Sequence, residues 1–260
     1  MTTYAKPLIL AENLFELGTP TATDTDADTQ YDVLNILDRR TYTYWLALSA
    51  GTKYLTIDCG TDQDSDTLAI IGHNLYTANA TVSVEWSADG VSWTEALAGF
   101  VPTSDGALLK TYTKVTKRHK RIRIVTASIA PKIAVAFIGS RVDFPKSWPA
   151  AEFDPWTQKV EAQSTRSKTG NLLGNVLQYV GIRTTLSLKY LDASWIDSTF
   201  RPLWNTYLSQ LYPVFFAWEL TNHATEVHFV KIPDDYELVM PFSGRADLRN
   251  LELELEGVKE

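Results

Sequence analysis

Short runs in which apolar and polar residues alternate fill the chain from 31 to 143, and turn residues separate them. In VSVEW (82–86), for example, the valines and the tryptophan share one face of an extended strand, while serine and glutamate occupy the other. Asp89 and Gly90 then form a turn, because glycine tolerates the positive φ that tight hairpins require. Further predicted strands are YLTID at 54–58, TLAIIG at 67–72, RIRIV at 121–125 and KIAVAFIG at 132–139. Many short strands at this spacing predict an antiparallel sandwich.

The character of the sequence changes after residue 144. Three prolines (Pro145, Pro149 and Pro155) are followed by a polar segment rich in serine, threonine and lysine. Such a stretch is typical of the boundary between two domains. We therefore predict a β-sandwich with an N-terminal arm over 1–144 and a second domain over 145–260.

The second domain contains the one clear helical pattern in the sequence. Apolar residues recur at spacings of three and four and predict an amphipathic helix near 194–211, which Asp192 or Ser194 can cap. Pro202 predicts a kink or a later start of that helix. The rest of the domain is expected to be β-rich. Its predicted strands are RTTLSLKYL at 183–191, a hairpin of VFFAWEL and TEVHFVKI, and a closing LRNLELELEG with leucines on one face and glutamates on the other.

Composition and charge narrow the functional classes. The 260 residues are 45% hydrophobic, enough for a substantial core, and their net charge of -7 argues against nucleic-acid readout. No apolar run approaches the roughly 20 residues that span a bilayer, so we expect no membrane insertion. The opening MTTYAKPLIL lacks the features of a signal peptide, and the single cysteine, Cys59, excludes an internal disulfide. Both observations fit synthesis in a reducing cytoplasm.

Four segments of the first half, taken in order, resemble the discoidin-like family of galactose-binding-type jelly rolls. NILDRRTYTYW (35–45) is similar to the corner motif of that family, YLTIDCG (54–60) to an early strand, and VEWSADGVSWTEA (84–96) to V-x-Y-S-x-D-G-x-x-W. KRIRI (120–124) followed by IAVAFIG (133–139) resembles the closing pair of strands. The resemblance implies that the first domain is a discoidin-like antiparallel jelly-roll sandwich.

Members of that family often bind glycans or lipid headgroups through loops at one end of the sandwich. The resemblance therefore implies candidates for ligand binding in the corner loop and after the strand at 67–72, namely Arg39, Arg40, Tyr42, Tyr44, His73 and Asn74. An exposed aromatic ring beside an arginine suits a sugar, since the ring covers the apolar sugar face and the guanidinium donates to hydroxyls. The alternative, which we favour, is that Tyr42 and Tyr44 pack against a neighbouring subunit or the second domain, because exposed aromatics mark protein interfaces at least as often as ligand sites.

Two departures from the family pattern bear on metal binding. Arg39 stands where the family usually has a corner glycine, and Ala136 and Phe137 occupy the stretch where calcium-binding members tend to carry a glutamate. The acidic repeat DTDAD at 24–28 lacks the glycine and the glutamate of a calcium loop, which favours a solvated acidic loop. We therefore predict no metal site.

The basic run KVTKRHKRIRI (114–124) has two interpretations. It can bind nucleic acid, or it can meet the acidic surface of a partner or of another copy of the chain. The net acidic balance of the whole protein favours the second interpretation.

Catalytic motifs are absent from the sequence. The four histidines form no H-E-x-x-H or other metal-binding spacing, and there is no G-x-S-x-G, P-loop or G-x-G-x-x-G. Cys59 falls inside a predicted strand, which indicates a core residue. We therefore expect a protein that is not an enzyme, with no catalytic residues and no cofactor.

A second resemblance extends over nearly all of the chain. AENLFELGT (11–19), IIGHNL (70–75), PVFFAW (213–218) and LELEG (253–257) resemble segments of a class of bacteriophage tail-tip or baseplate proteins, related in role to distal tail proteins. The C-terminal half of this chain also has a predicted strand–helix–strand–strand unit, which is similar to tail-tube-type ring domains. The resemblance implies a structural virion protein of the phage tail, assembled in the cytoplasm of the bacterial host. Its implied partners are other copies of itself in a hexameric ring, the tube, hub, tape-measure or fibre proteins, and a host-surface glycan.

The large aromatic residues of the second domain agree with this resemblance. About a hundred residues cannot easily bury so many rings, so contacts between subunits are a natural place for them. The residues concerned are Trp156, Trp195, Phe200, Trp204, Phe215, Phe216 and Trp218. The alternative function is a freestanding carbohydrate-binding module or adhesin, which would not need residues 145–260 to bind a glycan.

Overall fold

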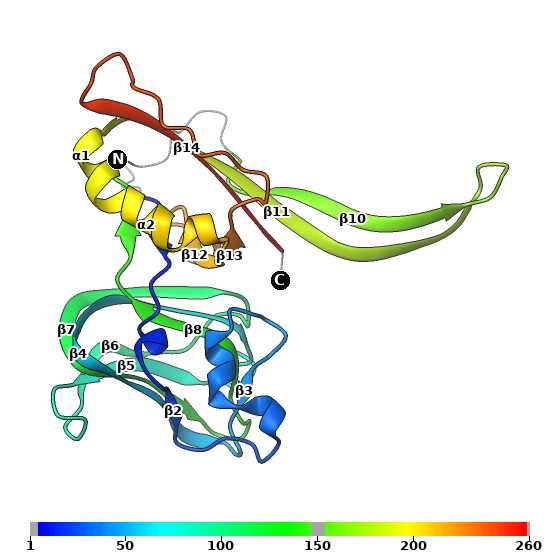
Figure 1. Ribbon diagram of the computed structural model, residues 1–260. Helices are drawn as coiled ribbons and strands as arrows, with labels where there is room; N and C mark the ends of the chain where they lie inside the picture. The colour runs from blue at the N-terminus through cyan, green and yellow to red at the C-terminus, as the bar shows by residue number, and fades with distance from the viewer. Residues whose placement is uncertain (1–4, 147–153, 259–260) are drawn as a thin grey trace. The chain divides into compact units, whose positions relative to one another are not determined.

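A computed structural model describes residues 5–146 and 154–258. The chain divides into two compact units, each described here by itself (Figure 1). The sandwich unit comprises Leu8–Val142 with His223–Val227, and the hairpin unit comprises Met1–Pro7, Asp143–Asn222 and His228–Glu260. The short strands β1 (Leu8–Leu10) and β9 (Val142–Asp143) stand where the sequence passes from one unit to the other.

The sandwich unit is an antiparallel β structure in which the strands follow the order β3-β8-β4-β7-β5-β6, with β2 added beside β4. Its strands are β2 (Thr21–Ala22), β3 (Trp45–Leu46), β4 (Gly51–His73), β5 (Thr81–Ser87), β6 (Thr94–Phe100), β7 (Leu108–Thr126) and β8 (Lys132–Gly139). The register of β4 and β7 shifts at Asp58/Gln63 and at Ser65/Thr67. Such irregularities bend strands, and Figure 1 shows both strands curving round the unit.

The core of the sandwich unit is made by the predicted alternation. Leu55 and Ile57 of β4, Val84 of β5, and Ile122 and Ile124 of β7 are all at most 1% exposed. The segments predicted as separate strands at 54–58 and 67–72 are two parts of β4, because the bend lets one strand continue round the core. Trp86, which the alternation places on the same face as Val82 and Val84, is only half-buried, and the Lys117 ammonium lies 5.2 Å from its ring centre.

Helical structure in the sandwich unit is limited to short 3-10 turns. They are η1 (Leu14–Leu17), η2 (Thr29–Tyr31) and η3 (Val33–Leu37). Each begins at an Asn or Asp whose side chain accepts a hydrogen bond from a backbone N–H two residues on, as helix-capping residues do.

The hairpin unit contains a second antiparallel sheet in which β10, β11, β14, β13 and β12 are neighbours in that order. The strands are β10 (Thr157–Arg166), β11 (Leu172–Asp192), β12 (Val214–Ala217), β13 (Val227–Lys231) and β14 (Leu248–Val258). Leu186 of β11 is paired with Leu253 of β14 and Leu188 with Leu251. Leu251, Leu253 and Leu255 are buried while Glu252 is exposed, so the apolar face predicted for the last strand is confirmed.

The predicted helix is present but is not one regular α-helix. It consists of α1 (Ala193–Trp195), the π-helical turn η4 (Ile196–Phe200), α2 (Arg201–Thr206) and the 3-10 turn η5 (Leu208–Gln210). Pro202 lacks an N–H for the preceding turn, and its ring crowds the carbonyl four residues back. The turn before it is wider, and the Arg201 N–H donates to the carbonyl of Ile196, five residues away. Asp192 precedes the helix without a side-chain cap, and Leu211 ends it at φ 59°.

Three of the seven rings expected at contacts between subunits are buried inside the hairpin unit instead, and the four tryptophans are half-buried. Phe200, Phe215 and Phe216 are 0% exposed. Trp156, whose ring centre lies 5.8 Å from that of Phe216, is half-buried. The described part of the chain contains no helix that is long and apolar enough to cross a membrane.

A long two-stranded hairpin, which the sequence pattern did not predict, extends from the sheet of this unit. Residues 181–192 of β11 pair with β14, whereas the preceding part of β11 pairs only with β10 among the described residues. Figure 1 shows β10 and β11 continuing together well beyond β14. We call residues 157–180 the long hairpin and residues 166–171 its tip.

Candidate functional site

Arg39, the first of the candidate ligand-binding residues, is committed to internal contacts. Its backbone has φ 57°, in the region that favours glycine, and its side chain is only 8% exposed. Its Nη2 lies 2.8 Å from Oε1 of Glu16, and the guanidinium carbon lies 4.8 Å from the centre of the Phe137 ring. These contacts of the Arg39 side chain, which a corner glycine cannot make, hold the loop to the rest of the sandwich unit.

His73 and Asn74 also have structural partners. Nδ1 of His73 accepts a hydrogen bond from the Leu75 N–H at 3.2 Å. Burial, only partly offset by the carboxylate of Asp105, lowers the pKa of His73 to about 4, so the ring is neutral at pH 7. Asn74 donates from Nδ2 to the carbonyl of Ala130 at 3.0 Å and accepts at Oδ1 from the N–H of Lys132 at 2.9 Å.

The other three candidates lie at the surface. The Tyr42 side chain is 74% exposed, and the guanidinium carbon of Arg40 lies 5.9 Å from its ring centre. The ring of Tyr44 stacks on that of Tyr31, with centres 5.1 Å apart and planes 25° apart, and Nζ of Lys132 lies 5.2 Å from the Tyr44 ring centre. We call Tyr31, Arg40, Tyr42, Tyr44 and Lys132 the tyrosine patch.

The chemistry of the tyrosine patch suits an uncharged polar ligand with an apolar face. Aromatic faces can cover a sugar ring while Arg40 and Lys132 donate to hydroxyls. A hydrogen bond with Tyr44 is the main cause that raises the pKa of the Tyr31 hydroxyl. Sequence reasoning missed Tyr31 and Lys132, because stacking between η2 and the corner loop has no signature in local spacing.

Three of the six lysines and arginines in the basic run are paired with neighbouring carboxylates. Lys114 pairs with Asp64, and Nη2 of Arg118 lies 2.6 Å from Oδ2 of Asp58. Arg121 lies between two rings, 3.9 Å from the centre of Tyr54 and 4.0 Å from that of Trp93, and its Nη2 is 2.6 Å from Oε2 of Glu85. Lys120, only 1% exposed, donates to the carbonyls of Gln63 and Lys117 at 2.8 Å each. Four of the basic side chains therefore have local partners.

The acidic repeat at 24–28 is engaged in the local structure. The Lys53 ammonium donates to Asp24, which also accepts from the Leu48 N–H at 3.3 Å. Asp28 accepts from the N–H of Gln30 at 3.1 Å and so begins η2. Within the ranges that the structure describes, no three His, Cys, Asp or Glu side chains are placed to hold a metal ion.

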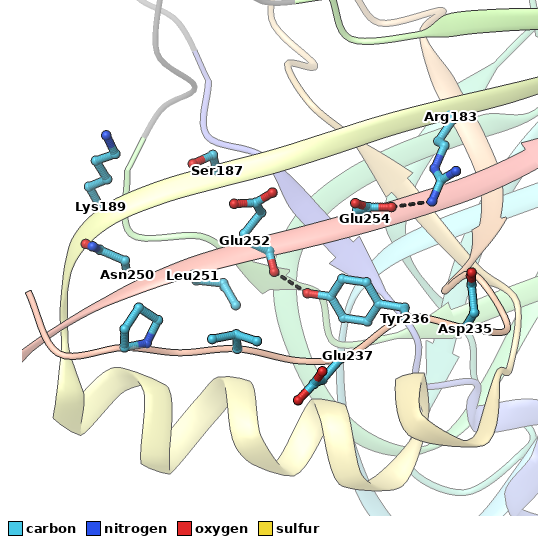
Figure 2. Close-up of a pocket in the computed structure, with 12 residues that line it drawn as sticks. Arg183, Ser187, Lys189, Asp235, Tyr236, Glu237, Asn250, Leu251, Glu252 and Glu254 are labelled. Atoms are coloured by element: carbon cyan, nitrogen blue, oxygen red, sulfur yellow. Dashed lines mark hydrogen bonds and ion pairs between the residues drawn. The ribbon is translucent and has the colours of Figure 1, made fainter.

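A groove of about 550 Å³ lies in the hairpin unit, between the β11–β14 pair and the segment that follows β13 (Figure 2). That segment runs apart from β14 after Lys231 and rejoins it where the Asn250 N–H donates to the Pro241 carbonyl at 3.0 Å. The lining is mostly polar and acidic, with Arg183, Ser187, Lys189, Asp235, Tyr236, Glu237, Val239, Pro241, Asn250, Leu251, Glu252 and Glu254. We call it the acidic groove.

The Tyr236 side chain lies across the acidic groove, and the pKa of its hydroxyl reflects the negative charge there. Its hydroxyl donates to the carbonyl of Glu252, as Figure 2 shows. Burial and the negative charges of Glu252 and Glu254 raise the pKa of Tyr236 to about 12. Arg183 neutralises Glu254. No pattern in the sequence indicates this groove, because the groove depends on a loop that leaves its neighbouring strand.

The long hairpin carries a third candidate surface. Its exposed large apolar side chains are Val160 at 63%, Leu172 at 58%, Leu173 at 67%, Val176 at 66%, Leu177 at 59% and Tyr179 at 48%. Val176 and Leu177 are adjacent on one strand and so point to opposite faces. Both faces of the hairpin are therefore partly apolar and open to solvent in the single chain.

No family model matches the chain, and no curated protein matches it. Among solved structures it is similar to a GH29 fucosidase from Ruminococcus gnavus in complex with fucose, at 20% identity and a TM-score of 0.44. That match covers 50% of this chain and 27% of the fucosidase chain. Chitosan-binding module 1 of a chitosanase/glucanase from Paenibacillus sp. IK-5 is 14% identical, with a TM-score of 0.42 over 50% of this chain and 98% of the module. CpGH89CBM32-5 from Clostridium perfringens, in complex with GalNAc-β-1,3-galactose, is 12% identical. Its TM-score is 0.44, and the match covers 50% of this chain and 99% of that protein.

Proposed function

We propose that this chain is a non-catalytic structural subunit of a multi-copy assembly, of the phage tail-tip or baseplate kind that its sequence resembles. The observation that carries the proposal is the long hairpin, which leaves six large apolar side chains in solvent. In this proposal the chain assembles in the bacterial cytoplasm and becomes part of the virion tail.

The energetics of a two-stranded ribbon support an intermolecular role. An isolated hairpin is at best marginally stable in water, because it has no layer on which to bury a face. Burying Leu173, Val176 and Leu177 against another copy contributes about 1.5 kcal/mol or more for each side chain. A contact between different surfaces of the same chain closes into a ring when the rotation allows it, and a hexamer is the ring that the resemblance implies.

The molar mass of the full chain in solution tests this function. The unmodified chain is compared with a variant carrying Leu173→Thr, Val176→Thr and Leu177→Thr, since threonine keeps the preference for strands while removing apolar area. A matched control changes three exposed apolar residues of the sandwich unit, Leu48, Val91 and Val101, to threonine. We expect the unmodified chain and the control to form one defined oligomer and the hairpin variant to remain a monomer. An unmodified chain that stays monomeric, and is absent from purified tails, contradicts the proposal.

A second candidate function is carbohydrate binding by the sandwich unit, either within the assembly or as a freestanding module or adhesin. The specific observation that favours it is the exposed Tyr42 ring beside Arg40, next to the stacked Tyr31 and Tyr44. A glycan array with the full chain tests it. Signals that Tyr42→Ala removes and that Tyr76→Ala retains, Tyr76 being an exposed ring of the same unit, support the function. An array without any signal removes this candidate and leaves the first one standing.

A further inference from the structure

We propose that the tip of the long hairpin of one chain docks into the acidic groove of a second copy of the chain. This inference rests on the proposed multi-copy assembly and deepens it, because it names the two surfaces that meet. One surface is a basic turn and the other is an acidic cleft, and both belong to the hairpin unit.

The tip is the only charged part of a long stretch of the hairpin. Between Glu161 and Arg183 the sequence contains two charged residues, Arg166 and Lys168, and both are basic. Arg166 donates to the carbonyl of Gly170 at 3.2 Å, and neither side chain has an acidic partner in the part of the chain that the structure describes. Two positive charges are therefore presented at the end of the hairpin.

The turn holds these charges in a defined shape. The N–H of Ser167 donates to the carbonyl of Asn171 at 2.8 Å, and the N–H of Gly170 donates to the carbonyl of Ser167 at 2.9 Å. Gly170 has φ 86°, which glycine adopts without strain. A preorganised turn loses less conformational entropy on binding than a flexible loop does.

The acidic groove offers charges of the opposite sign. Four carboxylates line it, those of Asp235, Glu237, Glu252 and Glu254, against the two cations Arg183 and Lys189. Glu254 is paired with Arg183, whereas no described residue forms an ion pair with the other three carboxylates. The excess of two negative charges in the groove matches the two positive charges of the tip, and such complementarity gives an interface its register and specificity.

The size of the acidic groove and its apolar lining residues also fit the tip and the leucines beside it. A volume of about 550 Å³ lies within the range of pockets that enclose a ligand, and it accommodates a few side chains of a turn. Val239, which is 54% exposed, and Pro241 line the groove beside the carboxylates. Leu172 and Leu173 directly follow the tip and are 58% and 67% exposed. The basic end and its apolar flank can therefore meet acidic and apolar parts of one groove.

The contact is between copies rather than within one chain. Figure 1 shows the tip at the far end of the hairpin from the start of β14, where Asn250 and Leu251 line the groove. The tip and the groove are different surfaces, so each chain inserts its tip into one neighbour and accepts the tip of another copy in its own groove. Such a contact leads to an open filament or to a closed ring, of which a reciprocal dimer of two copies is the smallest.

Charge reversal on the two sides tests the docking. The variant Arg166→Glu/Lys168→Glu reverses the charge of the tip. The variant Asp235→Lys/Glu237→Lys reverses the charge at two carboxylates of the groove that have no ion pair. We expect each variant alone to weaken self-association at least about tenfold, and the chain that carries all four changes to regain it. Asp62→Lys/Glu95→Lys, which makes the same charge change at exposed sites of the sandwich unit, is the matched control and should associate as the unmodified chain does. Thermal unfolding of every variant checks that it is folded.

The outcomes separate this inference from the proposed function. If the unmodified chain associates and both reversals leave that association unchanged, the docking is wrong and the assembly stands. If reversal of the tip or of the groove alone weakens association but the chain with all four changes does not regain it, the docking is also overturned, because the two sites do not meet. If the unmodified chain is monomeric even at millimolar concentration and is absent from tails, both proposals fail.

Discussion

The guanidinium of Arg39 lies 4.8 Å from the centre of the Phe137 ring, and Phe137 is fully buried in β8. The same side chain pairs with Glu16, at 2.8 Å, while its backbone has φ 57°. A non-glycine residue with positive φ costs about 1 kcal/mol relative to glycine. The contacts with Glu16 and Phe137 offset that cost, which explains how an arginine can occupy the corner.

Removing the Arg39 side chain should therefore destabilise the sandwich unit. We expect Arg39→Ala to lower the free energy of unfolding by about 2 kcal/mol, since it removes a half-buried ion pair and a cation–π contact but keeps the strained backbone. Arg39→Gly should lose about 1 kcal/mol less, because glycine adopts the same φ without strain. Urea unfolding of both variants measures the difference, with the neighbouring Arg40→Ala as control. Equal losses for alanine and glycine would show that the positive φ carries no cost.

Gly72 combines a positive φ with a close neighbour, so a methyl group should be poorly tolerated there. Its φ is 66°, and a Cβ built there would lie 2.6 Å from Cβ of Ala134 on β8. Gly51 also has a positive φ, 120°, but a Cβ there meets nothing within 4 Å. We expect Gly72→Ala to cost about 3 kcal/mol and Gly51→Ala about 1 kcal/mol in unfolding free energy. Thermal melts of the two variants provide the comparison, and a Gly72→Ala melt equal to that of Gly51→Ala contradicts it.

His73 should make stability fall in acid. Burial, only partly offset by Asp105, holds the pKa of folded His73 at about 4, below the value near 6.5 of the unfolded chain. The unfolded state therefore binds the proton first, so stability is complete above pH 6.5 and declines as the pH falls from 6.5 towards 4. The loss amounts to about 3 kcal/mol at most. Urea midpoints between pH 7.5 and about pH 4.5 should decline less steeply for His73→Gln than for the unmodified chain; identical slopes would exclude His73 as the source.

Much of the fold follows from local pattern. The leucine face of the last strand and the helix near 194–211 were visible in the sequence, because one face of each is buried and the spacing records it. The strand at 132–139 is buried on both faces and was visible as a continuous apolar run. The long hairpin was not visible. Its apolar residues lie on both faces among serines and threonines, so residues 157–180 alternate in no simple way.

The candidate sites were less predictable than the fold. Arg40, Tyr42 and Tyr44 were expected at a surface and lie there, but Arg39, His73 and Asn74 use their polar groups within the sandwich unit. Such partners are distant in sequence: Asn74 bonds to Ala130 and Lys132. The acidic groove depends in the same way on where one loop leaves its strand, which spacing in the sequence does not record.

Amide hydrogen exchange of the long hairpin, followed as the concentration of the full chain rises, tests the central claim most directly. In a monomer the hairpin amides of residues 157–180 should exchange rapidly, because a solvent-exposed two-stranded ribbon opens readily. We predict that their protection increases in step with the molar mass as the assembly forms, while the amides of β4 in the sandwich core stay protected throughout. A hairpin that exchanges just as rapidly in the assembled state would contradict the account, since the copies would then be joined through another surface.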